Sequence, residues 1–485
     1  MKKKLFSIAL IVSMVFSACA APKTEKESVK KQEADQRKEI VWTIEKSDQI
    51  PQKNIDKLNQ ALKQKGYNFY VTFDYIEYEI QNDIKYSKKL KQKIKNKETD
   101  LFFCGWKSAN APWLVNEFLN SGLLYPLNDW LRSGQGRKVY QLYDPEIWKS
   151  GAINGKIYGF PNEKIIYSEE VKAAFNKKYI SEKKIKNWDG NLKSLMNILD
   201  HTRMKKDEIP VAGFPSWTGF TRFASSAKYL ELDNFYVDLD KMVLYQPFEV
   251  KEFYDYLAFW NECYKKGYVY SVSMDGGAYS EEEFAVIEQK KYAVTFEPEE
   301  NEDASFVYKT APFCIGCNTG SMTGISNRSE KKEECLELMK ALRTDDTLAD
   351  LLVWGDTAEN IQGSDGYAAD TLEPAGDMDL GLADGILQES GQYPAKLREY
   401  KKQQLSSPLR QKNTIIGFQP DYSGIHKEMK AYLKAVDKYK DCWKEDDFKA
   451  AYQRAEREVG KAAQKVLKKL NQQMRQWKKE KEEAK

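Results

Sequence analysis

The sequence contains very little histidine: only His201 and His426 occur in 485 residues. Neither lies in an HExxH motif, and the chain has no GxSxG motif, so no zinc-protease site or serine-hydrolase triad is recognisable. Glycine-rich loops of the P-loop or dinucleotide type, which cradle phosphates, are also missing. We therefore expect neither nucleotide hydrolysis nor nucleotide-dependent redox chemistry in this chain.

Cysteine is also scarce, with seven residues in the whole chain. Cys314 and Cys317 form the only CxxC, and no second CxxC or CxxH accompanies it, which argues against zinc. A thioredoxin-type CxxC would open a helix, whereas this one runs into a turn-forming Asn-Thr-Gly-Ser. A local disulfide and two separate buried thiols both remain open. The aspartate-rich stretch from Gly363 to Gly385 lacks the Glu that closes an EF-hand loop, so we predict no metal and no cofactor.

The formal net charge is only +3, and removal of Lys2, Lys3 and Lys4 with a signal segment brings it near zero. Such a balance gives no indication of nucleic-acid binding. The last 25 residues are locally basic, with nine Lys or Arg and three Glu from Lys461 to Lys485. Apolar residues recur there at threes and fours, so we expect a helix with one buried face and a solvated basic face. Contact with anionic lipid is the alternative.

The N-terminus reads as an export signal. A basic start precedes an apolar run from Leu5 to Phe16 and the small pair Ser17-Ala18. As a helix that run spans about 18 Å, short of the ~30 Å of a bilayer core, so we expect it to be removed. Small residues ending in Cys19 resemble the lipobox of bacterial lipoproteins, although Phe16 stands where Leu is usual. The resemblance implies lipidation of Cys19; an ordinary signal that leaves a soluble protein is the alternative.

Residues 20–38 are mostly Lys, Glu, Gln and Ser, and they cannot bury enough apolar surface to fold. We interpret them as a tether. Beyond it, 41% hydrophobic and 13% aromatic residues are ample for a globular body of two or three lobes.

The body begins with alternating strand and helix patterns. Strands are predicted at Glu39–Ile44, Phe69–Tyr75 and Asp100–Trp106. Helical spacing lies between them, around Ile55–Leu62 and over Tyr86–Lys97. This order predicts a parallel sheet in a layered α/β lobe. Further on, Asn154-Gly155 between two isoleucines is a strong signal for a two-residue hairpin.

Several stretches together resemble a known family, the carbohydrate-type extracellular solute-binding proteins of ABC importers. They are DLFFCGWKSANAPWLVNEFLNSGLLYPLNDWL (100–131), YDPEIWKSGAINGKIYGFPNEKIIY (143–167), AVTFEPE (293–299), TGISNRSEKKEECLELMKALRTDDTLADLLVWG (323–355) and GFQPDYSGIHKEMKAYLKAVDKYKDCW (417–443). The resemblance implies an α/β fold of the type II periplasmic-binding-protein class, with two hinged lobes that close on a ligand. Each lobe is expected to be a mixed or parallel sheet flanked by helices.

The same resemblance suggests how the chain is divided. We predict a signal peptide at 1–18, a tether at 19–38, a first segment of lobe 1 at 39–150, the main segment of lobe 2 at 151–320, a return to lobe 1 at 321–365, and a mainly helical part at 366–485 that completes the lobes.

Sugars stack on aromatic rings and hydrogen-bond to carboxylates and amides at the rim. The aromatic candidates are loop residues just after strands, where ligands of open α/β sheets lie: Tyr75, Tyr78, Trp106, Trp217 and Trp354. The polar candidates are Glu163, Glu297, Asn318 and Asp356. Each could instead be a core ring or a surface position. Helix-like or apolar contexts favour a core role for Trp113, Trp130, Trp148, Trp260 and Trp477.

The resemblance implies a lipid-anchored, monomeric binding protein on the outer face of the cell membrane. Such a protein would capture an oligosaccharide or related sugar and deliver it to the transmembrane subunits of an ABC permease, without catalysing a reaction. Peptides or other polar solutes, and a sensory role, are alternatives. An exported glycoside hydrolase is a further alternative, because two carboxylates would suffice for it and a chain with 73 acidic residues always offers a pair.

Overall fold

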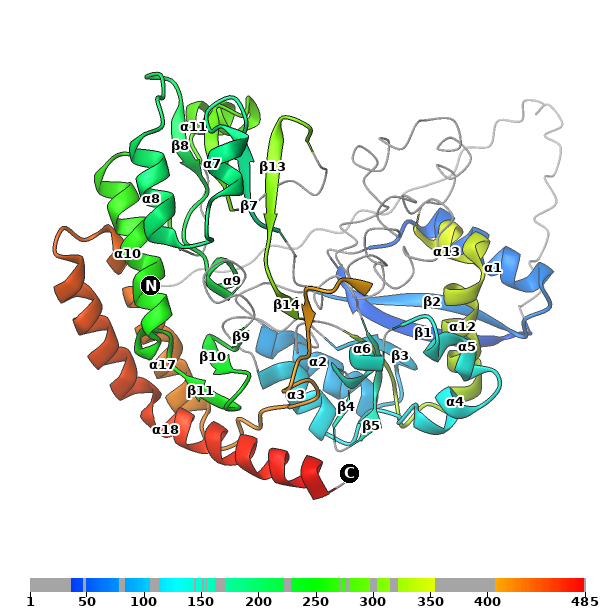
Figure 1. Ribbon diagram of the computed structural model, residues 1–485. Coiled ribbons are helices and arrows are strands. Elements are labelled where there is room, and N and C mark those ends of the chain that lie inside the picture. The colour runs from blue at the N-terminus through cyan, green and yellow to red at the C-terminus, as the bar shows by residue number, and fades with distance from the viewer. Residues whose placement is uncertain are drawn as a thin grey trace, which may run out of the picture. The chain divides into compact units, whose positions relative to one another are not determined.

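The computed structural model describes residues 36–46, 49–77, 83–104, 113–143, 145–150, 152–153, 155–161, 171–221, 228–270, 272–274, 279–296, 303–314, 322–353 and 406–483. The helices and strands of the described residues belong to one unit, Lys38–Lys485 (Figure 1). Cys19 lies outside the described residues, as do Cys317, most of the predicted tether and the Gly363–Gly385 stretch.

The first sheet begins with three parallel strands. β1 (Lys38–Glu45) lies between β2 (Phe69–Ile76) and β3 (Leu101–Phe103). Helix α1 (Gln52–Gln64) connects the first two strands and buries Ile55, Leu58 and Leu62. The helix ends at Gln64, and Gly66, two residues further on, has a φ of +85°, which favours glycine. The predicted alternation of strand and helix is confirmed.

A strand from far along the chain completes this sheet. β15 (Met322–Ile325) pairs antiparallel with β3 and with β6 (Gly159–Pro161), so the order is β2-β1-β3-β15-β6. Gly159 lies so close to Met322 that a Cβ would approach its sulfur to 2.4 Å. Just before β6, β4 (Ala152–Ile153) and β5 (Lys156–Ile157) form the predicted hairpin. Gly155 in its turn has φ +74°.

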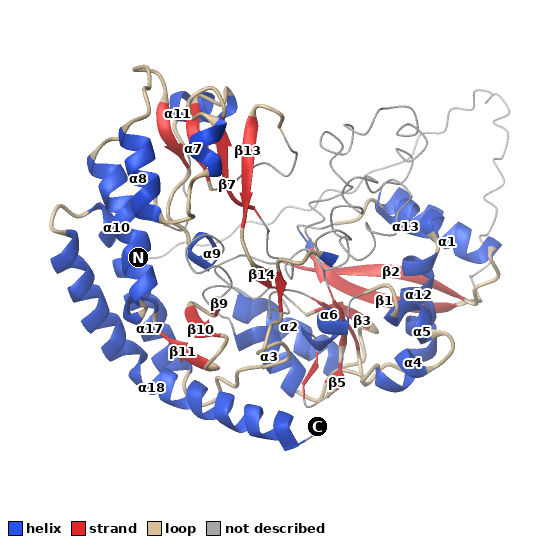
Figure 2. Ribbon diagram, viewed as in Figure 1, coloured by secondary structure: helices blue, strands red, loops and turns tan. Residues whose placement is uncertain are grey.

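Helices cover both faces of the first sheet. Figure 2 shows α1, α12 and α13 on one side and α2 and α3 on the other. The remaining helices of this part are α2 (Asp83–Lys95), α3 (Trp113–Asn120), α4 (Asn128–Arg132), α5 (Gly136–Tyr140), α6 (Pro145–Ser150), α12 (Lys332–Thr344) and α13 (Asp346–Val353). Together they enclose one hydrophobic core, which contains Trp42, Phe102 and Trp148.

The second sheet has the order β13-β7-β12-β8. β12 (Tyr292–Thr295) runs parallel to β8 (Ile209–Ala212) and antiparallel to β7 (Val171–Asn176), which pairs antiparallel with β13 (Phe306–Thr310). Every residue of β8 and β12 is buried, because one face packs on a large core and the other on a smaller one. Near-continuous apolar runs are typical of strands covered on both faces.

A smaller antiparallel sheet and several helices extend the large core. The sheet has the order β11-β10-β9, with β9 (Tyr229–Leu232), β10 (Phe235–Asp238) and β11 (Val243–Tyr245). The helices are α7 (Glu182–Lys186), α8 (Leu192–Asp200), α9 (Trp217–Gly219), the 3-10 turn η3 (Pro247–Glu249) and α10 (Lys251–Lys265). Helix α11 (Glu281–Glu288) instead packs Val286 and Ile287 against the smaller core.

The described residues after 425 are mostly helical. α17 (His426–Tyr439) is followed by the 3-10 turn η6 (Cys442–Lys444) and the 36-residue α18 (Phe448–Glu483). α18 packs along α17 and contacts η3, η6 and β11 (Figure 1). Its predicted buried face is confirmed: Ala455, Val459, Ala463, Val466, Leu470 and Met474 are buried, and Ala462, Leu467 and Trp477 are partly buried.

The segment before α17 contacts residues of both main cores. β16 (Arg410–Gln411) pairs in parallel with β14 (Phe313–Cys314), and Arg410 forms an ion pair with Glu146 of α6 at 3.0 Å. Further along, the Thr414 hydroxyl donates to the carbonyl of Leu239. The Asn116 amide of α3 donates to the carbonyl of Pro420 at 3.1 Å. This segment thus joins the first-sheet part of the protein to the second-sheet part.

Candidate functional site

The strand directions define where a ligand site can form. β6 runs parallel to β3, because both pair antiparallel with β15, so β6 ends at the carboxyl edge of the first sheet. β7 runs antiparallel to β12, so it begins at the carboxyl edge of the second sheet. The connection 162–170 therefore leads from one carboxyl edge to the other. By the same reasoning, β13 ends at the second carboxyl edge and β15 begins at the first.

The two carboxyl edges are thus joined twice by short connections. In open α/β sheets the carboxyl edge is where ligands bind, since the loops that follow the strands meet there. Two such edges joined by two crossings have the connectivity of a hinged binding protein. This arrangement makes the loops after β1, β2, β3, β6, β8 and β12 the candidate ligand site.

Trp217 lies in the loop after β8. Gly213, directly after the strand, has φ +121°, and the Ser216 hydroxyl accepts a hydrogen bond from the backbone nitrogen of Gly219 at 2.9 Å. The short helix α9 that results holds a half-buried Trp217 ring. This ring stacks on Phe253 of α10, with the centroids 5.5 Å apart and an interplanar angle of 17°.

Two buried tyrosines hold the backbone of this loop. The Tyr256 hydroxyl accepts from the Ser216 nitrogen at 3.1 Å, and the Tyr236 hydroxyl donates to the Trp217 carbonyl at 3.3 Å. Burial raises the pKa of Tyr236 well above its ordinary value, so that hydroxyl keeps its proton. Gly219 is required by packing, because a Cβ there would come within 2.8 Å of the Tyr256 hydroxyl. These contacts therefore fix the position of the loop that carries Trp217.

Tyr75 lies within β2, near its carboxyl end and opposite Ile44 of β1, and not in the loop after the strand as predicted. The ring is half-buried against the first core. Its hydroxyl accepts from the Ile50 nitrogen at 3.2 Å and lies 3.4 Å from the Ile50 carbonyl. Burial raises the pKa of Tyr75. Tyr75 and Trp217 belong to the edges of different sheets, and the hydroxyl of Tyr75 has a structural partner in the chain that follows β1.

The other predicted site residues lie outside the described part of the chain. They are Tyr78, Trp106, Glu163, Glu297, Asn318, Trp354 and Asp356. Among the rings predicted to be core, Trp148 and Trp260 are buried, and Trp130 and Trp477 are half-buried. The side chain of Trp113 is outside the described residues.

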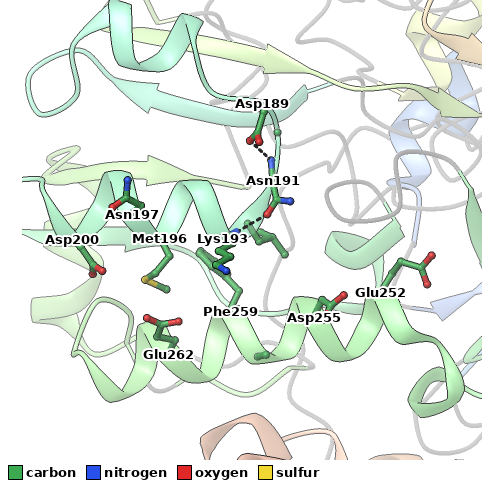
Figure 3. Close-up of a pocket in the computed structure, with 13 residues that line it drawn as sticks. Asp189, Asn191, Lys193, Met196, Asn197, Asp200, Glu252, Asp255, Phe259 and Glu262 are labelled. Carbon is green, nitrogen blue, oxygen red and sulfur yellow. Dashed lines mark hydrogen bonds between the residues drawn. The ribbon is translucent and has the colours of Figure 1, made fainter.

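A groove of about 820 Å³ lies between α8 and α10 (Figure 3). Five carboxylates line it, and most are paired with lysines. Lys266 binds Asp200 at 2.7 Å and Glu262 at 2.8 Å, and it holds the pKa of Asp200 below its ordinary value. Glu252 pairs with Lys228 at 2.6 Å, and Asp255 with Lys251 at 2.7 Å. Because these carboxylate oxygens already bind lysines, they have less capacity to accept hydrogen bonds from a ligand, and the groove is a weaker candidate than the strand edges.

A second groove, of about 750 Å³, lies along the C-terminal half of α18 and is lined by Trp477, Phe418 and several amide side chains. Trp477 contacts Phe418 edge to face at 5.7 Å, and the Lys481 ammonium lies 4.5 Å from the centre of the Trp477 ring. With an aromatic ring and a cation against it, Trp477 has little ring surface left for stacking a sugar.

Sequence reasoning missed the residues that position Trp217. Phe253 and Tyr256 occur three residues apart on α10, and Tyr236 lies on β10; this spacing predicts a buried helix face but not which loop that face supports. The density of aromatics beside the turn-rich loop at 213–219 was the available signal.

The described residues also show no cluster of three or more His, Cys, Asp or Glu side chains suited to a metal ion. Cys104, Cys263, Cys335 and Cys442 are buried thiols, and burial raises the pKa of each, to about 12 for Cys442. Buried thiols with a high pKa are poor nucleophiles. In the same described part, no helix is both long enough and apolar enough to cross a bilayer.

No protein-family model and no curated protein matches the sequence. Solved structures do match the fold. The N-glycan transport solute-binding protein NgtS of Streptococcus pneumoniae has a TM-score of 0.64 at 18% identity, over 92% of this chain and 100% of that one. The ABC-transporter substrate-binding protein FusA of S. pneumoniae, in complex with kestose, has a TM-score of 0.55 at 13% identity, over 91% of this chain and 100% of that one.

These matches span almost the whole of each chain. The protein therefore has the two-lobed α/β fold of the solute-binding proteins of ABC transporters, which confirms the fold class predicted from the sequence. At this level of identity the likeness establishes the fold.

Proposed function

We propose that this protein is the solute-binding component of an ABC importer and that it captures an oligosaccharide. The observation that carries the proposal is the structural match to NgtS and FusA over nearly the full length of each chain. Structures of these two proteins include complexes with Man1GlcNAc and with kestose, respectively. The strand-edge connectivity supports it, because two carboxyl edges joined by two crossings suit closure over a ligand.

The predicted site residues have positions in the chain that suit this proposal. Tyr78 follows β2, Trp106 follows β3, Glu163 follows β6 and Glu297 follows β12. Each of these strands ends at a carboxyl edge. We propose that these residues, with Trp217, line the ligand site, and that Tyr75 contributes mainly its ring.

The assignment of the strands to two separate main sheets also supports a division into two lobes. β6 is part of the first sheet and β7 of the second, so we propose the first hinge crossing within 162–170, further along the chain than the predicted boundary between 150 and 151. The second crossing falls between β14 and β15, near the predicted boundary at 320.

We further propose that the protein is lipidated at Cys19, is held on the outer face of the cell membrane and delivers its ligand to a separate permease without catalysing a reaction. The export signal and the lipobox-like Cys19 support the anchor. Neighbours that are transport binding proteins support a binding role over glycoside hydrolysis.

A thermal-shift screen of the mature chain tests the proposal. Mannose–N-acetylglucosamine glycans, fructo-oligosaccharides, maltodextrins and a panel of short peptides are compared at equal concentration. At a hundredfold excess over Kd, a true ligand stabilises the folded state by about 2.7 kcal/mol. A rise in melting temperature with at least one glycan class supports the proposal. If no glycan raises the melting temperature but a peptide does, the result would favour the alternative of a peptide-binding protein.

A further inference from the structure

The basic C-terminal stretch belongs to a larger charged surface. From Arg457 to Lys479, α18 contains eight Lys or Arg and one acidic residue, Glu458. Arg457, Lys461, Lys468 and Arg475 are all exposed. With 3.6 residues per turn, their spacings of four, seven and seven residues place them within about 40° of one another on the side opposite the core.

Helix α17 adds a second row of lysines. Lys427, Lys430, Lys434 and Lys438 are exposed at spacings of three and four, opposite the buried Met429, Tyr432 and Val436. The two acidic residues of α17 already have partners: Glu428 pairs with Lys465 of α18, and Asp437 with Lys440. We call these four lysines and the four basic residues of α18 named above the basic ridge.

The two rows open on the same side of the protein. α17 packs against part of the longer α18 (Figure 1). The Lys465–Glu428 pair bridges them with side chains 64% and 27% exposed, so the seam between the helices faces solvent. None of Arg457, Lys461, Lys468 and Arg475 forms an ion pair with another described residue. Exposed helices ordinarily mix charges of both signs, because like charges one turn apart repel.

We propose that the basic ridge is a docking surface for an anionic lipid bilayer. The inference rests on the membrane location in the proposed function. A lipid on Cys19 and a tether of 19 residues would keep the body within roughly 25 Å of the headgroups. An anionic membrane surface attracts clustered Lys and Arg over about one Debye length. The mature chain is near neutral, so this attraction acts through the ridge and orients the body.

The contact is electrostatic and does not involve insertion. The apolar face of α18 is occupied by the core of the protein, where Val466, Leu470 and Met474 are fully buried. An amphipathic helix that inserts into lipid needs that face free. Binding through the ridge must therefore require anionic lipid and must weaken as salt increases.

The test uses the mature chain from residue 20, without lipid, which retains the whole compact unit. Cosedimentation is measured with vesicles of phosphatidylglycerol and phosphatidylcholine in equal parts, and with pure phosphatidylcholine. The ridge variant K461E/K468E/R475E is compared with K183E/K184E/K186E on α7. Those three lysines are also exposed and give the same change in net charge.

The expected result is binding to the mixed vesicles only, lost in high salt, reduced about tenfold or more in the ridge variant and nearly unchanged in the α7 variant. If the ridge variant misfolds, K461Q/K468Q/R475Q replaces it and should show the same loss in weaker form. Equal loss in both charge variants, equal binding to neutral vesicles, or binding to soluble polyphosphate without binding to vesicles would overturn the inference.

Glycan-induced melting shifts on the same proteins keep the two proposals separate. If the protein does not bind vesicles but glycans still stabilise it, only the proposed docking surface is wrong. If vesicle binding depends on the ridge but no glycan raises the melting temperature, only the proposed ligand class is wrong.

Discussion

The ring and the backbone of Trp217 are held by different residues. Its ring stacks on Phe253, its carbonyl accepts from Tyr236, and the nitrogen of the preceding Ser216 donates to Tyr256. Because the ring is only half-buried, its removal costs less packing than removal of a core ring, for which about 3–5 kcal/mol is typical. The ring can therefore be tested for ligand binding without unfolding the loop that carries it.

We predict that Trp217→Ala weakens binding of the stabilising glycan by roughly 1–3 kcal/mol, as expected for a stacking contact at the centre of a site. Trp217→Phe should recover part of this loss. Titration and melting curves measure the two effects. Trp477→Ala is the matched control, a half-buried ring on the same core that should lower stability and leave affinity unchanged. Unchanged affinity in Trp217→Ala would remove the ring from the site.

Asp303 gives a pH-dependent prediction at the same scale. Its carboxylate accepts from Lys290 at 2.6 Å and from the Ser305 nitrogen at 2.7 Å. These partners, Lys290 foremost, hold the pKa of Asp303 well below its ordinary value. A folded-state pKa below the unfolded one means that the stabilisation is complete above about pH 4 and is lost as the pH falls toward the folded-state pKa.

Asp303→Asn should therefore lower the free energy of unfolding by up to about 1 kcal/mol at pH 7, a small value because the ion pair is partly exposed. The difference from wild type should shrink as the pH falls below about 4. Chemical denaturation at several pH values measures this. A difference that grows in acid would contradict the assignment.

At the scale of elements, α18 shows what periodicity can establish. Its apolar residues at threes and fours predicted the buried face correctly, because an amphipathic pattern needs only local information. The partner of that face was not predictable, since η3, η6, β11 and α17 meet α18 only in the folded chain. Periodicity has the same limit for β15: the family resemblance predicted a return to lobe 1 there, but the place of β15 between β3 and β6 depends on pairing across more than 150 residues.

Leu470→Ala tests whether α18 is an integral part of the second core. The side chain is fully buried, so its truncation should cost about 2–5 kcal/mol and lower the melting temperature by several degrees. Gln472→Ala, two residues away and exposed, should change stability very little. A melting temperature in Leu470→Ala equal to that of wild type would mean that α18 is dispensable for the fold.

At the scale of the whole molecule, the two-lobed fold followed from the order of degenerate motifs, each weak alone. The site was less accessible to sequence reasoning. Turn formers around Trp217 marked it as a loop residue. Nothing in the sequence around Phe253, Tyr236 and Tyr256 indicates which loop these residues support. Residues that act through long-range packing resemble any other core residue until the fold is known.

The proposed anchor gives a prediction at this scale. Cys19→Ala should abolish lipid attachment, so the protein should move from the membrane fraction to the medium. Fractionation followed by immunoblotting measures this distribution. Retention of the variant at the membrane, at wild-type level and in high salt, would contradict the anchor; the salt wash removes protein held only by charge.

The most direct test of the binding function is calorimetric titration of the mature chain with the glycan that stabilises it most, combined with chromatography of the glycan afterwards. We predict saturable binding of one glycan per chain, with the glycan recovered intact. No binding to any oligosaccharide, or recovery of shortened sugars, would contradict a non-catalytic oligosaccharide-binding protein.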